Sequence, residues 1–438
     1  MPLGLNLFSR RPGFDGGLFL ADHKSVTARR PSETIGAVGA VNIPLSHSAA
    51  IKTNVISSIG HRLLGGELIA APIDAAGIGV HAPTSGVITA FSRAWSAHDG
   101  FLPSAIFEPD GRDERVKSHV AWEEESILAM LSRHAVMCCY PRKPAHVVLR
   151  DAVAAGATTL IINGMETEPY LTADLRALVE MPGRMVDAAC EIADALGASR
   201  LIIAIPDRHR RVFKRIAAES VARFVEVVAL PDKYPQCHPV ILTKTLLELE
   251  TSPGGSTLDL GVLVLSPGAL RPMADAIFDD RPMTHVVISI AGDAVVAPGT
   301  YRVPIGIDFA SIGRHVGLNS DAPTFVAGGP FTGIHVPRSD AVVTSSTTAV
   351  LIFQSSQRVD PTACVHCGWC VEDCPVGVSP VELAQLELQA SCPTRLLPEL
   401  RACIDCGLCT FVCPSRLPLA ATIRHSRDRF AGGVEELS

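Results

Sequence analysis

The chain has 438 residues, which is enough for several domains that each bury a hydrophobic core. Its formal net charge of −7 and its 19% of charged residues argue against a nucleic-acid-binding protein, which needs clustered basic side chains to neutralise phosphates. No apolar run reaches the roughly 18 residues of a membrane span, and no signal-peptide core is present. We therefore expect a cytoplasmic protein without a transmembrane segment. Its mean hydropathy of +0.28 indicates large cores or a face docked on a partner.

Residues 1–35 are expected to form an N-terminal extension, followed by a β-rich domain over residues 36–115. Two segments, GHRLLGGELIA at 60–70 and APTSGVI at 82–88, resemble the barrel-sandwich hybrid fold of lipoyl and biotinyl domains. No lysine occupies the hairpin, so we expect a packing domain without a swinging cofactor arm.

Residues 116–275 alternate short β-branched apolar runs with amphipathic helical segments. This alternation predicts a parallel sheet with crossover helices, a Rossmann-like domain. Ligands of such sheets bind beyond the carboxyl ends of the strands. The segment NGMETEPY at 163–170 follows the predicted strand at 158–162, so it is expected at that edge.

Two cysteine runs near the C-terminus share the spacing C-x2-C-x2-C-x3-C-P. Eight of the 13 cysteines lie in them, and a cytosolic chain of this size is not expected to use cysteines as a disulfide framework. In two-cluster ferredoxins the last cysteine of each run ligates the other cluster. The predicted ligands of one [4Fe–4S] cluster are therefore Cys364, Cys367, Cys370 and Cys413, and those of the second are Cys403, Cys406, Cys409 and Cys374.

Zinc is disfavoured as the metal of these runs, because it takes four ligands from two cysteine pairs whereas here a three-plus-one pattern repeats. The 28-residue spacer predicts a helix that begins at Ser379-Pro380 and a second short helix in RLLPELRA. Residues 351–438 are thus expected to form an α-helical two-cluster ferredoxin module. Cys392 breaks the pattern and is predicted to be a buried core residue.

Several segments together resemble the C subunit of the Rnf electron-transport complex, a relative of the flavin-binding subunit of respiratory complex I. They are FDGGLFLADHK at 14–24, VHAPTSGVI at 80–88, LIINGMETEPYLTADLRALVE at 160–180, DKYPQC at 232–237, FVAGGPFTG at 325–333 and the two cysteine runs. The resemblance runs through nearly the whole chain in order. It implies a β-grasp domain of the soluble-ligand-binding type at residues 276–350. The implied fold class is a multidomain α/β and β protein.

The resemblance also implies a function. Members of this family take electrons from NADH at a flavin mononucleotide and pass them through two [4Fe–4S] clusters to partner subunits. The flavin converts hydride transfer into single-electron steps. Of the family's flavin and nucleotide neighbourhood, this chain retains Asn163, Glu166 and Glu168. The alternative interpretation is that these residues hold a strand-to-helix turn, with a helix capped by Thr172 or Asp174.

The chain departs from the family at its glycine-rich loop, G-x-G-G-A-G-F-P-T. Such glycines let the backbone approach the flavin, and side chains there would occupy the space of the cofactor. Cys237 replaces a further glycine in the same predicted pocket. When Phe-Pro of the loop is aligned with Tyr140-Pro141, the glycine positions hold His134, Val136, Met137 and Cys139, and the alanine position holds Cys138.

A new metal site in this pocket is disfavoured, because no metal-type spacing supports it. Its candidate ligands would be His134, His146, Cys138, Cys139 and Cys237.

These observations predict an electron-transfer protein with two [4Fe–4S] clusters and without the usual FMN and NADH site. Its partner would be a redox protein, such as the membrane subunits of a complex, a flavoprotein or a dehydrogenase, and it would then lie on the inner face of the cell membrane. Two alternatives remain. One is an NADH-dependent oxidoreductase with a rebuilt flavin site, including enzymes that resemble corrinoid reductases. The other is a docking scaffold without catalysis.

Overall fold

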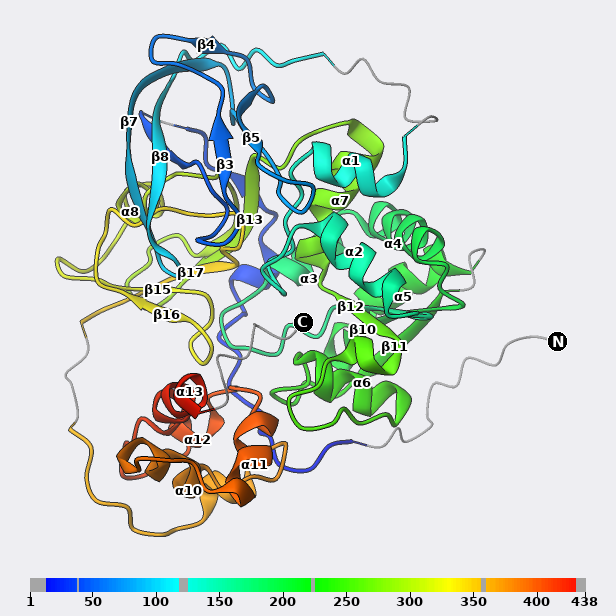
Figure 1. Ribbon diagram of the computed structural model, residues 1–438, viewed down its shortest axis with the longest axis vertical. Helices are drawn as coiled ribbons and strands as arrows, with labels where there is room; N and C mark the ends of the chain where they lie inside the picture. The colour runs from blue at the N-terminus through cyan, green and yellow to red at the C-terminus, as the bar shows by residue number, and fades with distance from the viewer. Residues whose placement is uncertain (1–12, 38, 118–124, 222–224, 356–359, 431–438) are drawn as a thin grey trace.

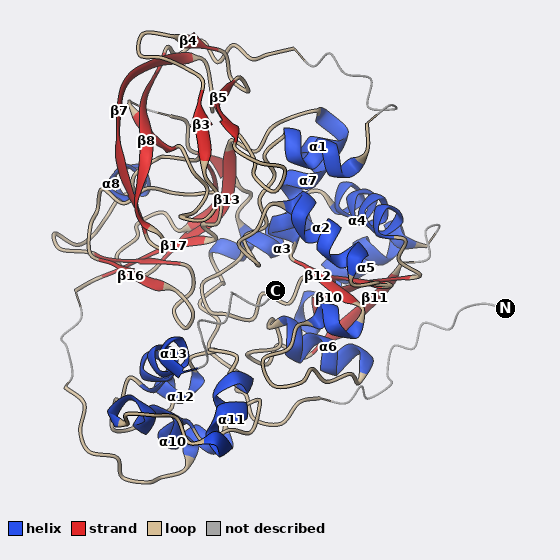
Figure 2. Ribbon diagram, viewed as in Figure 1, coloured by secondary structure: helices blue, strands red, loops and turns tan. Residues whose placement is uncertain are grey.

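The computed structural model describes residues 13–37, 39–117, 125–221, 225–355 and 360–430. Four folded units follow one another along the chain (Figure 1). A β-sandwich lies beside a helix-covered parallel sheet, a mixed sheet lies below the sandwich, and a helical module forms the lower end (Figure 2). The multidomain layout predicted from the sequence is confirmed. No helix among the described residues has the length and apolarity needed to cross a membrane.

The barrel-sandwich domain is built from two antiparallel sheets that enclose a core of alternating apolar residues such as Ile43, Ile69 and Phe107. One sheet has the order β2-β8-β7-β4 and the other the order β3-β5-β6. The strands are β2 (Val41–Pro44), β3 (Thr53–Val55), β4 (Arg62–Leu63), β5 (Leu68–Pro72), β6 (Val80–His81), β7 (Gly86–Ser96) and β8 (Gly100–Pro109).

The parallel-sheet domain has four parallel strands in the order β11-β10-β9-β12, as the alternating pattern predicts. Helices cover this sheet, and their apolar faces form the largest core cluster of the molecule. The strands are β9 (Thr159–Asn163), β10 (Arg200–Pro206), β11 (Glu226–Leu230) and β12 (Val262–Leu265). The helices are α1 (Ile127–Arg133), α2 (Ala145–Ala154), α3 (Ala173–Glu180), α4 (Pro182–Leu196), α5 (Arg210–Ser220), α6 (Pro239–Leu247) and α7 (Pro267–Asp279).

The mixed-sheet domain is where the β-grasp is predicted. Its six-stranded sheet has the order β1-β14-β13-β17-β15-β16, with α8 (Phe309–Val316) packed into the same core. The strands are β1 (Glu33–Thr34), β13 (His285–Ala291), β14 (Gly299–Pro304), β15 (Thr324–Ala327), β16 (Ile334–Val336) and β17 (Ala349–Phe353). The expected boundaries at 276 and 350 fall inside α7 and β17, because both elements continue their apolar pattern past those positions. The expected N-terminal extension supplies the edge strand β1.

The cluster module, residues 360–430, is helical as predicted. Leu383, Leu386 and Leu400 form its core, whereas Leu388 is 89% exposed. Leu388 differs because the helix tightens into a 3-10 turn at Gln385–Leu388, which changes the angular spacing of its side chains. The helices are α9 (Trp369–Glu372), α10 (Pro380–Ala384), α11 (Leu397–Ala402), α12 (Leu408–Phe411) and α13 (Leu419–Phe430). Cys392 is only partly buried against this core rather than fully buried.

The N-terminal segment ties the cluster module to the parallel-sheet domain. The Gly17 amide donates to the Asp373 carbonyl at 2.9 Å, and the next residue, Leu18, exchanges backbone hydrogen bonds with Tyr234 at 2.9 and 2.8 Å. Gly17 has a φ of +70°, and a Cβ atom there would lie 2.6 Å from the Tyr234 carbonyl oxygen. The close approach of three chain segments therefore requires glycine at this position.

Candidate functional site

The two cysteine runs fold in the same way. In each run the residue two positions after the first cysteine has a positive φ, His366 at +53° and Asp405 at +56°. A glycine two positions later does the same, Gly368 at +83° and Gly407 at +78°, and a four-residue helix follows. The two runs therefore share one backbone geometry, in line with their shared spacing.

Cysteines of the two runs lie near enough to influence one another, although among the described residues no three of them are placed to hold a metal ion. Burial raises the pKa of the Cys370 thiol, and the neighbouring thiols that raise it further are Cys367, Cys413 and Cys364. Burial also raises the pKa of Cys409 to about 12, with Cys403 and Cys374 contributing. Cys370 also acts on Cys409, so each of these thiols feels charges from both runs. The exchange of fourth ligands between the runs stays a prediction from the spacing.

The two predicted ligand sets, here the first and second thiol groups, differ in their surroundings. The second group faces a cavity of about 1060 Å³, which Cys374, Cys403 and Cys406 line. The first group lies at the surface, where Cys367 is exposed and Trp369 is 52% exposed. The pair of groups therefore spans the module from an internal cavity to the outside.

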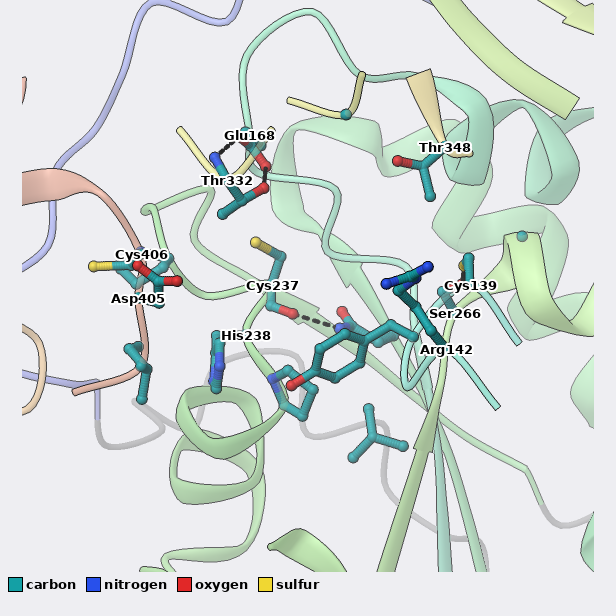
Figure 3. Close-up of a pocket in the computed structure, with 18 of the residues that line it drawn as sticks. Cys139, Arg142, Glu168, Cys237, His238, Ser266, Thr332, Thr348, Asp405 and Cys406 are labelled. Carbon is teal, nitrogen blue, oxygen red and sulfur yellow. Dashed lines mark hydrogen bonds between the residues drawn. The ribbon is translucent and has the colours of Figure 1, made fainter. Parts of the chain in front are cut away.

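The cavity also receives the three residues predicted as remnants of a flavin site, Asn163, Glu166 and Glu168. They follow β9 at the carboxyl edge of the parallel sheet, as expected. Figure 3 shows Glu168 bonded to Thr332. The Asn163 side-chain amide donates to the Cys237 carbonyl at 2.6 Å.

Glu166 and Glu168 hold other parts of the chain in place. The Glu166 carboxylate accepts from the amides of Asp174 and Leu175 at 3.1 and 3.2 Å and so caps α3, a role that Thr172 and Asp174 were expected to fill. Glu168 accepts from the amides of Phe331 and Thr332 at 2.7 and 2.9 Å and from the Thr332 hydroxyl at 2.9 Å. These bonds agree with the alternative interpretation, in which the segment stabilises turns.

The carboxyl groups beside the cavity share a buried environment. Burial raises the pKa of Glu166, which the Lys24 ammonium opposes, and Lys24 also donates to the Glu166 carbonyl. Burial together with the Glu166 charge raises the pKa of Asp174 to about 8. Asp174 accepts from the Gly268 amide at 2.5 Å, which fastens α3 to the start of α7.

The segment that replaces the glycine-rich loop is packed as core. Val136 and Cys138 are fully buried, and His134 hydrogen-bonds Asp280 at 2.6 Å. Met137 and Cys139 line the cavity, with the Cys139 sulfur 3.8 Å from the Ser266 hydroxyl.

Backbone amides in and next to this segment donate to other protein atoms, and the Met137 amide donates to the Met283 sulfur at 3.3 Å. Cys138 donates to Lys143 at 3.0 Å, and Ala145 donates to Val136 at 2.8 Å. These two amides are therefore occupied, and the residues present do not reproduce a glycine cradle for a flavin phosphate. Among the described residues, no group of three or more His, Cys, Asp or Glu side chains is placed to hold a metal ion.

An aromatic bridge joins three units next to the second thiol group, and the sequence did not reveal it. Tyr234 is 1% exposed and donates its hydroxyl to the Cys406 carbonyl at 2.6 Å. Phe331, on the loop that Glu168 holds, packs on Tyr234 at 4.9 Å and on Phe411 at 5.1 Å between ring centroids. The only signal available was the segment DKYPQC, whose tyrosine had no assigned role.

Family models match three parts of the chain. An RnfC barrel-sandwich hybrid domain matches residues 12–112, the Nuo51 FMN-binding domain matches residues 142–270, and a 4Fe-4S binding domain matches residues 358–378. The Nuo51 match begins directly after the segment that lacks the glycines.

Curated relatives are similar over most of the chain. The C subunit of an ion-translocating oxidoreductase complex of Rhodobacter capsulatus is 28% identical over 386 residues, 84% of this chain and 73% of that protein. The C subunit of a proton-translocating ferredoxin:NAD(+) oxidoreductase complex of Clostridium ljungdahlii is 28% identical over 85% of this chain and 84% of that protein. The corresponding protein of Salmonella arizonae is 27% identical, and this chain covers 57% of it.

Over most of its length the chain is thus similar to the C subunits of these complexes. Among solved structures, an NAD+-reducing [NiFe]-hydrogenase in the air-oxidised state matches with a TM-score of 0.50 at 18% identity, covering 71% of this chain and 62% of that chain. This match concerns the fold alone. The relatives belong to redox complexes, so electron transport and a 4Fe-4S domain are the functional features that this RnfC-like chain shares with them.

Proposed function

We propose that this RnfC-like protein relays single electrons between the internal cavity and a redox partner at the surface of the cluster module. The proposal is supported by the two cysteine runs of identical spacing, with Cys374, Cys403 and Cys406 lining the cavity and Cys367 exposed at the surface. Two [4Fe–4S] clusters held there would supply one-electron redox chemistry. The ligands would be Cys364, Cys367, Cys370 and Cys413 for the surface cluster and Cys403, Cys406, Cys409 and Cys374 for the inner one.

The protein itself would fix the position of the inner cluster. Tyr234 anchors the Cys406 carbonyl, and the Phe331 loop packs against Gly407, where a Cβ atom would lie 2.8 Å from the Phe331 carbonyl oxygen. These contacts hold the cluster-binding turn against the cavity wall. A rigidly held turn preserves the distance over which electrons transfer.

We further propose that the protein works without a flavin mononucleotide in the usual position. Met137 and Cys139 stand on the cavity wall where the family has glycines, and the amides of Cys138 and Ala145 are engaged within the turn. Electrons would then come from a separate flavoprotein, dehydrogenase or ferredoxin. By analogy with its relatives, the protein would be a peripheral, cytoplasmic member of a membrane complex or a soluble partner of one.

The test is the cofactor content of protein purified without oxygen. We expect about eight irons per chain, no flavin released by acid and no bleaching of the visible absorbance by NADH. An equimolar flavin whose 450 nm absorbance NADH bleaches would instead establish the NADH-dependent oxidoreductase with a rebuilt flavin site. Protein that holds neither iron nor flavin after anaerobic reconstitution would leave only the interpretation as a docking scaffold without catalysis.

A further inference from the structure

One end of the cavity is formed by two walls that carry positive charge. A face of α7 provides Gly268, Arg271 and Asp275, which stand at helical spacing toward the cavity. The opposite wall is the β13–β14 hairpin, where Arg302 pairs with Val287 across the strands, and both residues line the cavity. Two guanidinium groups from separate units thus border the same end of the cavity.

Neither guanidinium is satisfied by the protein. In the part of the chain that the structure describes, the side chains of Arg271 and Arg302 form no hydrogen bond and no ion pair, and the Arg271 Nη1 atom is sealed from solvent without an acceptor. A buried guanidinium nitrogen without an acceptor is costly, because its hydration is lost and nothing replaces it. A site with such groups is arranged for a ligand that supplies the acceptors.

Nearby carboxylates do not neutralise this end. Asp275 is bonded to Arg184 at 3.1 Å, and Glu180 accepts from Ser32 and Arg176. Burial lowers the pKa of Arg302, and the charges of Arg115, Arg271 and Arg281 lower it further against the opposing effect of Asp275. Asp275 is thus the carboxylate that acts on both Arg271 and Arg302, and it is shared with Arg184.

We propose that the Arg271–Arg302 end of the cavity binds the phosphate group of a small phosphorylated ligand. Two guanidinium forks on opposite walls need an anion with more than two acceptor oxygens, and a phosphate offers three whereas a carboxylate offers two. Arg271 lies five residues after Ser266, whose hydroxyl the Cys139 sulfur approaches at 3.8 Å, so this end of the cavity adjoins the segment at 134–141. The proposal holds independently of whether the two clusters relay electrons.

The experiment is calorimetric titration of the full, cluster-loaded chain with inorganic pyrophosphate as the probe. We expect saturable binding that Arg271→Gln and Arg302→Gln each weaken about tenfold or more, because each removes charge-assisted hydrogen bonds. The matched control is Arg281→Gln, which removes the same charge from a side chain that is 70% exposed and does not line the cavity. It should change the affinity less than about threefold, in line with a screened surface charge.

A second measurement needs no variant. Pyrophosphate should protect Arg271 and Arg302 of the wild-type chain from phenylglyoxal, as read by mass spectrometry, and should leave Arg281 unprotected. The proposal is overturned if the wild-type chain does not bind pyrophosphate, if all three variants bind it equally, or if a dicarboxylate such as malonate binds more tightly at the same arginines.

Discussion

At the scale of single residues, the cysteines carry the chemistry, and their exchange between runs is open to a direct test. Cys364→Ser should remove about four of about eight irons, because it deletes one ligand of the surface cluster and none of the inner one. Iron analysis and low-temperature electron paramagnetic resonance of the reduced protein measure this loss. The control is Cys392→Ser, a partly buried thiol of the same module outside both groups, which should keep all the iron. Loss of every iron, or of none, from Cys364→Ser would contradict the assignment.

A second residue-scale prediction concerns Asp174, whose pKa of about 8 lies far above the usual aspartate value of 3.8. The folded chain keeps a proton that the unfolded chain releases between those pH values, so the free energy of unfolding falls as the pH rises from about 4 to about 8. Asp174→Asn mimics the protonated form and should be more stable than wild type at pH 8 by about 1 kcal/mol or more.

Denaturant unfolding of the cluster-loaded protein at pH 5 and pH 8 measures the effect. The difference in the free energy of unfolding between Asp174→Asn and the wild type should be clearly larger at pH 8 than at pH 5. The control is Asp194→Asn, on the exposed face of α4. It should change the free energy of unfolding by the same amount at pH 5 and at pH 8. An Asp174→Asn variant without any pH-dependent advantage would show that the carboxyl group is ionised in the folded protein.

Individual residues also mark where sequence reasoning succeeded and where it did not. The 4Fe-4S domain could be predicted from local spacing, because three cysteines of each run lie within seven residues of one another. The roles of Glu166 and Glu168 did not follow, because their partners at 174 and 332 are brought close only by the fold. The role of Tyr234 did not follow either, because its hydrogen-bond acceptor, the Cys406 carbonyl, lies 172 residues away in the sequence.

At the scale of elements, the N-terminal segment acts as a strap between the cluster module and the parallel-sheet domain. Gly17→Ala should loosen it, because the new Cβ would lie 2.6 Å from the Tyr234 carbonyl oxygen and alanine disfavours a φ of +70°. We expect a cost of about 1–3 kcal/mol and faster hydrogen exchange in the peptides that contain Tyr234 and Asp373. Gly13→Ala is the control, since nothing lies within 4 Å of its Cβ position. Equal exchange in both variants would mean that the strap does not hold the module.

The elements themselves were largely predictable. Strands β9, β10 and β11 are short, apolar and β-branched, and the helices between them are amphipathic, so periodicity alone predicts the parallel sheet. Periodicity does not predict that residues 33–34 join a sheet whose next strand begins at Gly299, because a two-residue strand has no pattern. Periodicity also does not reveal the boundary between α7 and the mixed sheet, because both elements are apolar.

At the scale of the whole molecule, the order of the two thiol groups suggests a direction for the electron path. The inner group shares the cavity with the carboxyl edge of the parallel sheet, and the surface group is ringed by the exposed side chains of Val365 (66%), Trp369 (52%) and Val371 (44%). An apolar rim around a redox centre is typical of a surface that docks a partner. The sequence indicated such a face only through its high mean hydropathy.

This order predicts different behaviour for two single-cluster variants. Electron transfer slows steeply with distance, so a protein oxidant that cannot enter the cavity should react through the surface group. Cys406→Ser, which keeps the surface cluster, should therefore deliver its electron to oxidised cytochrome c at nearly the wild-type initial rate. Cys364→Ser, which keeps the inner cluster, should be several-fold slower, although dithionite reduces both. Stopped-flow absorbance of cytochrome c after anaerobic mixing measures the two rates. If Cys364→Ser were the faster variant, the inner group would be the one that meets the partner, and the path would have to leave through the cavity.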